Sequence, residues 1–164
     1  MIARRRVNSR AIVERMEMIL YLIVPWLTLL FLGAGRPSAD IQIGPLKNHA
    51  VVEGCGCYFS RTGDETNRLI LAVGVLDTAW MNLNGADTWL VITKSTKGEG
   101  AEKAGDMYSE FYRGGGYDVR VDYTVTYVCP PTDESCEFTG MNALITVRRG
   151  PSQGHAALTG SCGC

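Results

Sequence analysis

The clearest structural signal in the sequence is the alternating stretch Tyr117-Asp-Val-Arg-Val-Asp-Tyr-Thr-Val-Thr-Tyr-Val128. Tyr or Val occupies every second position from Tyr117 to Tyr127, and Asp, Arg and Thr lie between them. Because successive side chains of a β-strand point to opposite faces, this pattern predicts a half-buried antiparallel strand with Tyr117 and Tyr127 on the same face.

Runs of similar composition lie on both sides of this strand. They are rich in β-branched, aromatic and aliphatic residues, are bounded by Gly, Pro, Asn or Asp, and lack the period of an amphipathic helix. We expect the further strands to be Val51–Ser60, Leu69–Leu76, Ala79–Leu83, Thr88–Thr93, Met107–Arg113, Phe138–Val147 and His155–Ser161. About eight short strands predict an all-β fold, either a single antiparallel sandwich or a small barrel.

The N-terminal segment has a different composition. A basic start is followed by the apolar run Ile19–Leu32 and then by small residues up to Ala39. This order predicts a secretory signal peptide over residues 1–39 and a single β domain over residues 40–164. The apolar run is shorter than the roughly 20 residues that span a bilayer, which favours cleavage after Ala39, or alternatively after Gly35, over an uncleaved anchor.

The predicted domain is acidic. Residues 40–164 contain 10 Lys plus Arg and 15 Asp plus Glu, a net charge of -5. Such a domain gains nothing from counterion release at a phosphate backbone, so no nucleic-acid partner is expected. We expect a secreted or periplasmic protein, in contact with a membrane only if the N-terminal segment stays attached.

All the cysteines lie in the predicted domain: Cys55, Cys57, Cys129, Cys136, Cys162 and Cys164. An even number in an exported chain favours disulfides, and we expect three of them to staple the fold. A bridge between Cys129 and Cys136 would clamp the base of a loop. The two Cys-Gly-Cys pairs could form two bridges side by side. Antiparallel pairing joins Cys55 to Cys164 and Cys57 to Cys162, and parallel pairing exchanges these partners.

The same Cys-Gly-Cys pairs have an alternative interpretation. Four thiolates could hold zinc or copper(I), or each pair could act as a thiol redox centre. Zinc sites usually have two to four residues between paired cysteines, and no basic residue flanks either pair to lower a thiol pKa. We therefore expect no metal and no cofactor, and keep a soft-metal or thiol redox protein as an alternative function.

Residues that carry catalysis are scarce. Neither His49 nor His155 lies in a metal-binding motif, and no Ser occupies a nucleophile-elbow sequence. Asp118 and Asp122 are about 13 Å apart along one strand, farther than the carboxyl pair of a typical glycosidase. Arg120 lies between them, which indicates a cross-charged solvent face. We expect no catalytic residues and a non-enzymatic protein.

The most distinctive local feature is a predicted hairpin around Asn84-Gly85, the residue pair that favours a type I′ turn. This turn places Trp80 opposite Trp89, with Asn82 and Asp87 on the same face. The other face is the better candidate for the core, and it carries Met81, Leu83, Leu90 and Ile92.

Two exposed indoles beside an amide and a carboxylate would suit stacking on a sugar or contact with a protein partner. We therefore expect a binding or envelope-associated module with an unknown protein or glycan ligand at Trp80, Asn82, Asp87 and Trp89. The alternative is that this face is buried or covered by another strand.

A second alternative function comes from a short resemblance. Leu83-Asn84-Gly85, Leu90 and the stretch Ala104-Gly105-Asp106-Met107-Tyr108 resemble the periplasmic inhibitors of c-type lysozyme. That family consists of small antiparallel β-barrels, and it has a Ser at the position of Ala104, before the Gly of its inhibitory loop. The resemblance implies a small secreted inhibitor of a lysozyme or another hydrolase.

Overall fold

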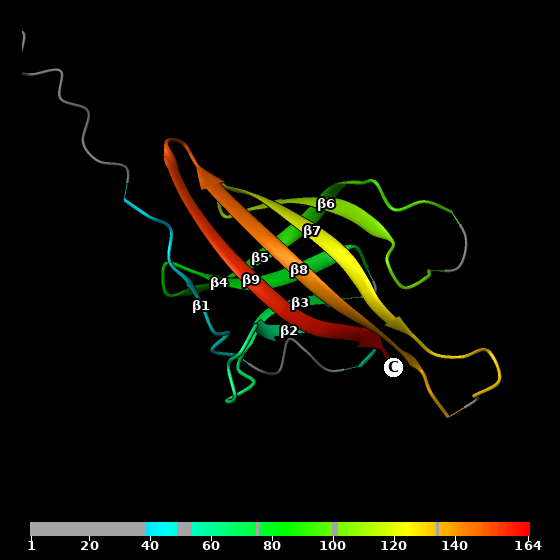
Figure 1. The fold of residues 1–164 in the computed structure, drawn as a ribbon. Coiled ribbons are helices and arrows are strands. Elements are labelled where there is room, and N and C mark those ends of the chain that lie inside the picture. The colour runs from blue at the N-terminus through cyan, green and yellow to red at the C-terminus, as the bar shows by residue number, and fades with distance from the viewer. Residues whose placement is uncertain (1–38, 49–53, 75, 100–101, 134) are drawn as a thin grey trace, which may run out of the picture. The chain divides into compact units, whose positions relative to one another are not determined.

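The computed structural model describes residues 39–48, 54–74, 76–99, 102–133 and 135–164. The predicted signal peptide lies outside the described residues apart from Ala39, and so does the start of the strand expected at Val51. The described residues belong to one compact unit, an all-β closed barrel of antiparallel strands with one short additional strand (Figure 1). Among them there is no helix with the length and hydropathy needed to cross a bilayer.

The barrel is built from strands that match the expected ones to within a few residues. They are β2 (Gly56–Arg61), β3 (Leu69–Gly74), β4 (Thr78–Leu83), β5 (Ala86–Ser95), β6 (Met107–Gly114), β7 (Tyr117–Val128), β8 (Phe138–Arg149) and β9 (Ser152–Gly163). Their order around the sheet is β4-β3-β2-β9-β8-β7-β6-β5, and β5 pairs again with β4. The predicted all-β fold is confirmed, and closure of the sheet makes it a barrel.

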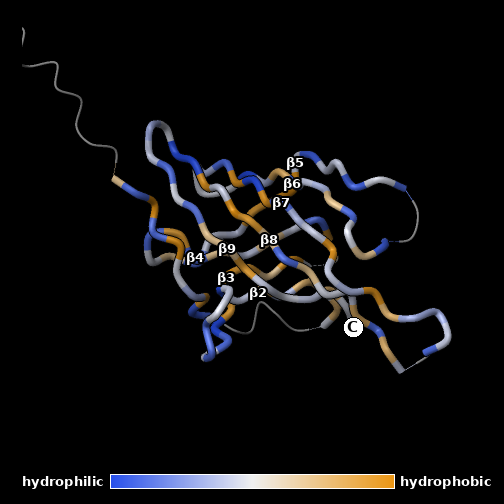
Figure 2. Tube along the Cα trace, in the orientation of Figure 1, coloured by the Kyte–Doolittle hydropathy of each residue, from blue (hydrophilic) through white to orange (hydrophobic). Residues whose placement is uncertain are grey.

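The barrel has two distinct ends. The turns β4–β5, β6–β7 and β8–β9 lie at one end, which we call the hairpin end. The start of β2 and the end of β9 lie at the other, which we call the disulfide end. Inward side chains from every barrel strand fill the space between, and Figure 2 shows hydrophobic residues along the strands with hydrophilic ones at the turns.

The predicted core face of the Trp hairpin is confirmed, because Met81, Leu83 and Leu90 are at most 1% exposed.

A short strand that the sequence did not predict lies at the hairpin end. β1 (Ile43–Gly44) pairs with the last residues of β4. The Ile41 N–H donates to the Gln153 carbonyl at 3.0 Å, and the Leu46 N–H donates to the Leu69 carbonyl at 2.7 Å. Ile41, Ile43 and Leu46 are buried. The chain before β2 therefore crosses this end of the barrel and contributes to its core.

The prediction that Tyr127 lies on the same face as Tyr117 is wrong. The register between β7 and β8 shifts between Val125 and Tyr127, which is the signature of a β-bulge. An extra residue reverses the alternation of faces beyond it. Tyr127 is therefore 42% exposed, with its ring centroid 5.4 Å from that of Phe138, while Val128 packs against the core.

The three expected disulfides are present. Cys55 is bonded to Cys164 and Cys57 to Cys162, so the Cys-Gly-Cys pairs adopt the antiparallel one of the two alternatives. Cys57 lies directly opposite Cys162 in the β2–β9 ladder, and both pack against the core. These two bridges join the start of the barrel to its last residues.

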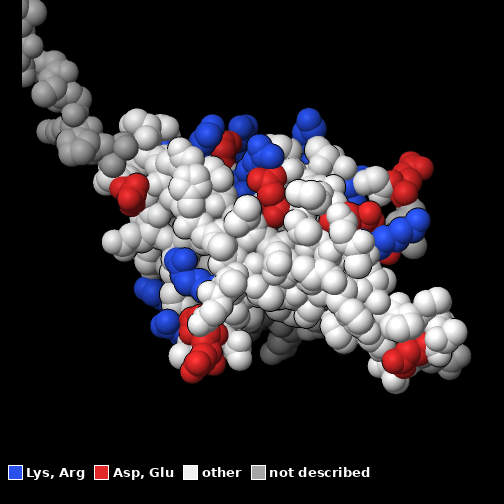
Figure 3. All heavy atoms as spheres, in the orientation of Figure 1, with Lys and Arg blue, Asp and Glu red and all other residues white. Residues whose placement is uncertain are grey.

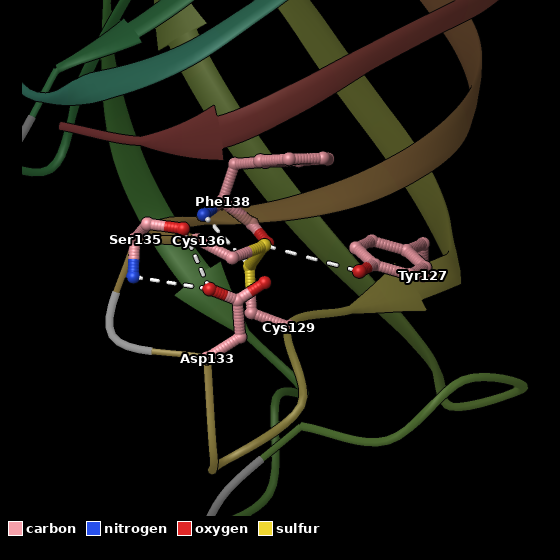
Figure 4. Close-up of a disulfide and its surroundings, with 6 residues drawn as sticks. All are labelled: Tyr127, Cys129, Asp133, Ser135, Cys136 and Phe138. Carbon is pink, nitrogen blue, oxygen red and sulfur yellow. Dashed lines mark hydrogen bonds between the residues drawn. A yellow bond between two sulfur atoms is a disulfide. The ribbon is translucent and has the colours of Figure 1, made fainter.

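The third bridge, Cys129–Cys136, closes the loop between β7 and β8 (Figure 4). Within this loop the Asp133 carboxylate accepts hydrogen bonds from the backbone N–H and the hydroxyl of Ser135. The described residues contain no free cysteine. With all six cysteines in disulfides, no thiolate is free to hold a soft metal in this state.

Candidate binding surface on the outer wall of the barrel

The Trp hairpin forms as the sequence predicts. Asn84 and Gly85 have φ angles of 52° and 83°, the left-handed values that a type I′ turn requires at both central positions. In the β4–β5 ladder Trp80 lies opposite Trp89, and Asn82 lies opposite Asp87. The core takes the other face of this hairpin. Both indoles therefore belong to the outer wall of the barrel, where Trp80 is half-buried and Trp89 is 53% exposed.

Asn82 does not lie at the surface, in contrast to the expectation. It is only 2% exposed. Gly44 of β1 pairs with it, and a Cβ added to Gly44 would lie 3.2 Å from Asn82 Oδ1. Its Nδ2 donates a hydrogen bond of 2.7 Å to Asp87 Oδ1. The amide is thus used inside the protein and is not available to a ligand.

The Asp87 carboxylate fixes the segment that covers Asn82. Its Oδ2 accepts hydrogen bonds from the backbone N–H groups of Lys47 at 2.9 Å and Asn48 at 2.8 Å. Partial burial acts to raise the pKa of Asp87, but the hydrogen bonds from Asn82, Asn48 and Lys47 and the charge of Lys47 outweigh it and hold this pKa below its usual value. Asp87 is therefore a structural anion in this fold.

A third aromatic side chain joins the two indoles. Tyr58 of β2 pairs with Ala72 of β3, Ala72 pairs with Trp80 of β4, and Trp80 pairs with Trp89. Tyr58 and Trp80 are two strands apart, a separation of about 10 Å, and the small Ala72 lies between them. The Tyr58 hydroxyl donates to the Gly54 carbonyl at 2.6 Å, which fixes the ring. We call Tyr58, Trp80 and Trp89 the aromatic row.

The wall around the aromatic row carries almost no charge. β9, β2, β3 and β4 are consecutive in the sheet, and their residues include one charged side chain, Arg61. The Arg61 guanidinium is used within the protein, where it donates to the Ile43 carbonyl at 2.5 Å. In Figure 3 an uncharged surface occupies the middle of the face on which β8 and β9 lie, and charged side chains surround it.

The barrel interior holds a separate group of polar side chains. The Tyr112 hydroxyl donates a hydrogen bond to the Glu110 carboxylate, and the rings of Tyr108 and Tyr123 are 5.0 Å apart. Burial, followed by the negative charge of Glu110, raises the pKa of Tyr112, so its hydroxyl stays protonated. The Tyr108 hydroxyl donates to Met141 Sδ at 3.7 Å, whereas the buried Tyr123 hydroxyl has no hydrogen-bond partner in the described part of the chain. Among the described residues no group of His, Cys, Asp or Glu side chains could hold a metal ion.

Comparison of the chain with protein-family models, curated proteins and solved structures finds no match. Sequence reasoning found Trp80 and Trp89 and missed Tyr58, because Tyr58 is distant along the chain and joins the row only through the β2–β3 and β3–β4 registers. No local motif could have identified it.

Proposed function

We propose that the protein is an exported, non-catalytic binding module whose aromatic row binds a sugar chain. The observation that carries this proposal is the placement of Tyr58, Trp80 and Trp89 in one cross-strand row on an uncharged outer wall. The C–H faces of sugar rings pack against aromatic faces, and neutral hydroxyls need no charged partner. Ser60, Thr78 and Ser161 supply hydroxyl groups on neighbouring strands.

Export is supported by the sulfur chemistry. Three disulfides indicate an oxidising compartment, because cytosolic thiols are kept reduced. Together with the basic and apolar N-terminal segment, this supports the periplasm or the cell exterior as the place of action. Sugar chains of the cell envelope are abundant there, which agrees with an envelope-associated module.

A glycan array tests the proposal with three proteins, the wild type, Trp89→Ala and Leu144→Ala. Leu144 is a matched control, because it is an apolar residue of β8, 61% exposed, and lies outside the aromatic row. We expect Trp89→Ala to lose at least tenfold in affinity for the sugars that the wild type binds, with an unchanged melting temperature. Leu144→Ala should bind as the wild type does. Equal binding by wild type and Trp89→Ala would contradict the proposal.

Inhibition of a lysozyme is the second candidate function, favoured by the closed antiparallel barrel that the family resemblance implies. The segment that would carry it is ordered by two backbone hydrogen bonds, from the Gly105 N–H to the Val125 carbonyl at 2.8 Å and from the Val125 N–H to the Asp106 carbonyl at 2.9 Å. A c-type lysozyme assay tests this candidate. Saturable inhibition that is weakened by Asp106→Ala would support it, and full lysozyme activity at excess protein would exclude it.

A further inference from the structure

A hollow of about 380 Å³ opens on the outer face of β6, β7 and β8. One cross-strand row crosses it, in which Arg113 pairs with Asp118, Asp118 with Arg148, and Arg148 with Gln153. The next row places Phe111 beside Arg120. Outward-facing side chains of neighbouring strands therefore bring three guanidinium groups to one shallow cavity.

Two of the three arginines are already paired. Arg113 Nε lies 2.7 Å from Asp118 Oδ1, and Arg120 Nη2 lies 2.8 Å from Asp122 Oδ1. Arg148 is exposed, and its guanidinium makes no hydrogen bond or ion pair with the other described residues. The predicted cross-charged face is present, with Asp118 paired to Arg113 and Asp122 paired to Arg120. The positive charge of Arg148 is not neutralised by either aspartate.

The excess positive charge of the hollow is opposite in sign to the net charge of the predicted domain. Residues 40–164 have a net charge of -5, whereas the lining of the hollow contains three arginines and two aspartates. Lys94 lies nearby, with its Nζ 5.7 Å from the centroid of the Phe111 ring. A basic hollow on an acidic domain attracts an anion locally, and it does so more strongly at low ionic strength.

The other residues that line the hollow suit a small ligand with hydroxyl groups. Arg120 lies over the ring of Phe111, with 5.7 Å from its Cζ to the ring centroid, so an aromatic surface forms part of the wall. Thr146 and Gln153 add polar groups to the lining. Both are hydrogen-bonded to the His155 ring, with 3.3 Å between Thr146 Oγ1 and His155 Nδ1 and 2.8 Å between Gln153 Nε2 and His155 Nε2. Hydroxyl groups of a ligand would find both donors and acceptors here.

We infer that this hollow binds an oxyanion, a carboxylate or a phosphate, carried on a sugar, and that Arg148 is its principal partner. A guanidinium presents parallel N–H groups that match both oxyanions in a bidentate manner. The hollow adjoins the aromatic row, because Val91, two residues after Trp89 on β5, pairs with Arg113 of β6. That the oxyanion is carried on a sugar rests on the proposed function; the oxyanion site itself does not.

An NMR titration with three monosaccharides tests the inference. Glucose, glucuronate and glucose 6-phosphate share one ring and differ at a single carbon, so they separate a carboxylate from a phosphate and both from a neutral hydroxyl. We expect the side-chain signal of Arg148 to shift with at least one of the two anions and not with glucose. Equal shifts with all three sugars, or shifts with none, would overturn the inference.

Variants locate the site and separate this inference from the proposed function. Arg148→Gln should weaken binding of the anionic sugar about tenfold. Arg148→Lys should weaken it less, because the charge remains. Arg68→Gln is the control, since Arg68 is an exposed arginine that pairs with Asp64 in a different loop.

If Arg148→Gln loses anion binding and Trp89→Ala still binds sugar as the wild type does, the oxyanion site is supported and sugar binding on the aromatic row is refuted. If Arg148→Gln still binds the anion and Trp89→Ala loses sugar binding, only the oxyanion site is refuted. Unchanged melting temperatures identify the variants that remain folded.

Discussion

Asp87 joins three parts of the molecule through one carboxylate. It accepts hydrogen bonds from the side chain of Asn82 on β4 and from the backbone of Lys47 and Asn48, which follow β1. Its lowered pKa means that the charged form is the one the fold stabilises. The residue is thus one of the polar links between the chain segment around β1 and the barrel wall.

Replacing Asp87 with Ala should lower the free energy of unfolding by about 2 kcal/mol, because three donors lose a charged acceptor. Urea unfolding followed by tryptophan fluorescence measures this loss. Glu65→Ala serves as the control, since Glu65 is an exposed carboxylate in the β2–β3 connection. A loss at Asp87 no larger than at Glu65 would show that the carboxylate does not fix the segment.

The contribution of Asp87 should depend on pH. Its folded-state pKa lies below the value of about 3.9 for an unfolded chain, so the stabilisation is present above that value and disappears as the pH falls through the folded-state pKa. The difference in unfolding free energy between wild type and Asp87→Asn should be constant between pH 6 and 7 and shrink below about pH 4. A difference that does not shrink as the pH falls below 4 would contradict this assignment.

At the scale of single elements, β2 and β9 approach each other unusually closely at Gly160. A Cβ there would lie 2.1 Å from the Tyr58 carbonyl oxygen and 2.6 Å from Phe59 Cδ1. Gly160→Ala should therefore cost about 2 kcal/mol through forced backbone movement, measured by urea unfolding. Ala157→Ser, at an exposed position of the same strand, should be close to neutral. A neutral Gly160→Ala would mean that the two strands can separate without loss.

Strand positions were predictable, because the period of two and the turn residues act locally. The stretch from Tyr117 to Val128 and the register of the Trp hairpin follow from these signals, and both are confirmed. β1 was not predictable, since a two-residue strand has no period and forms only where β4 offers an open edge. The placement of Tyr127 on the face of Tyr117 failed for a similar reason, because a bulge depends on the partner strand.

Some features of the candidate site could likewise be predicted from the sequence, and others could not. The outward placement of Trp80 and Trp89 follows from one hairpin and was predictable. The burial of Asn82 depends on the chain segment around Gly44, and the Arg148 hollow depends on the registers of β6 to β9, neither of which the sequence reveals. The sequence pattern identified the two faces of the Trp hairpin, but not which distant residues share them.

For the whole molecule, two adjacent disulfides close nearly the same loop, with sequence separations of 109 and 105 residues. On the loop-entropy model, closing a loop of this size is worth on the order of 4 to 5 kcal/mol. Cys55→Ser with Cys164→Ser should cost much less than this, because the bond between Cys57 and Cys162 still holds the loop closed. Replacing all four cysteines should cost the full amount. Additive losses in urea unfolding would contradict a shared loop.

The aromatic row spans three strands of the barrel, β2, β4 and β5. Trp80 and Trp89 are the only tryptophans after residue 39, so the emission of a chain cleaved at the predicted site reports on the row alone. The decisive measurement is a fluorescence titration of the exported protein with soluble peptidoglycan fragments in the presence of acrylamide. Sugar binding on the row predicts a saturable blue shift and protection of Trp89 from the quencher. Unchanged emission and unchanged quenching at saturating sugar would contradict it.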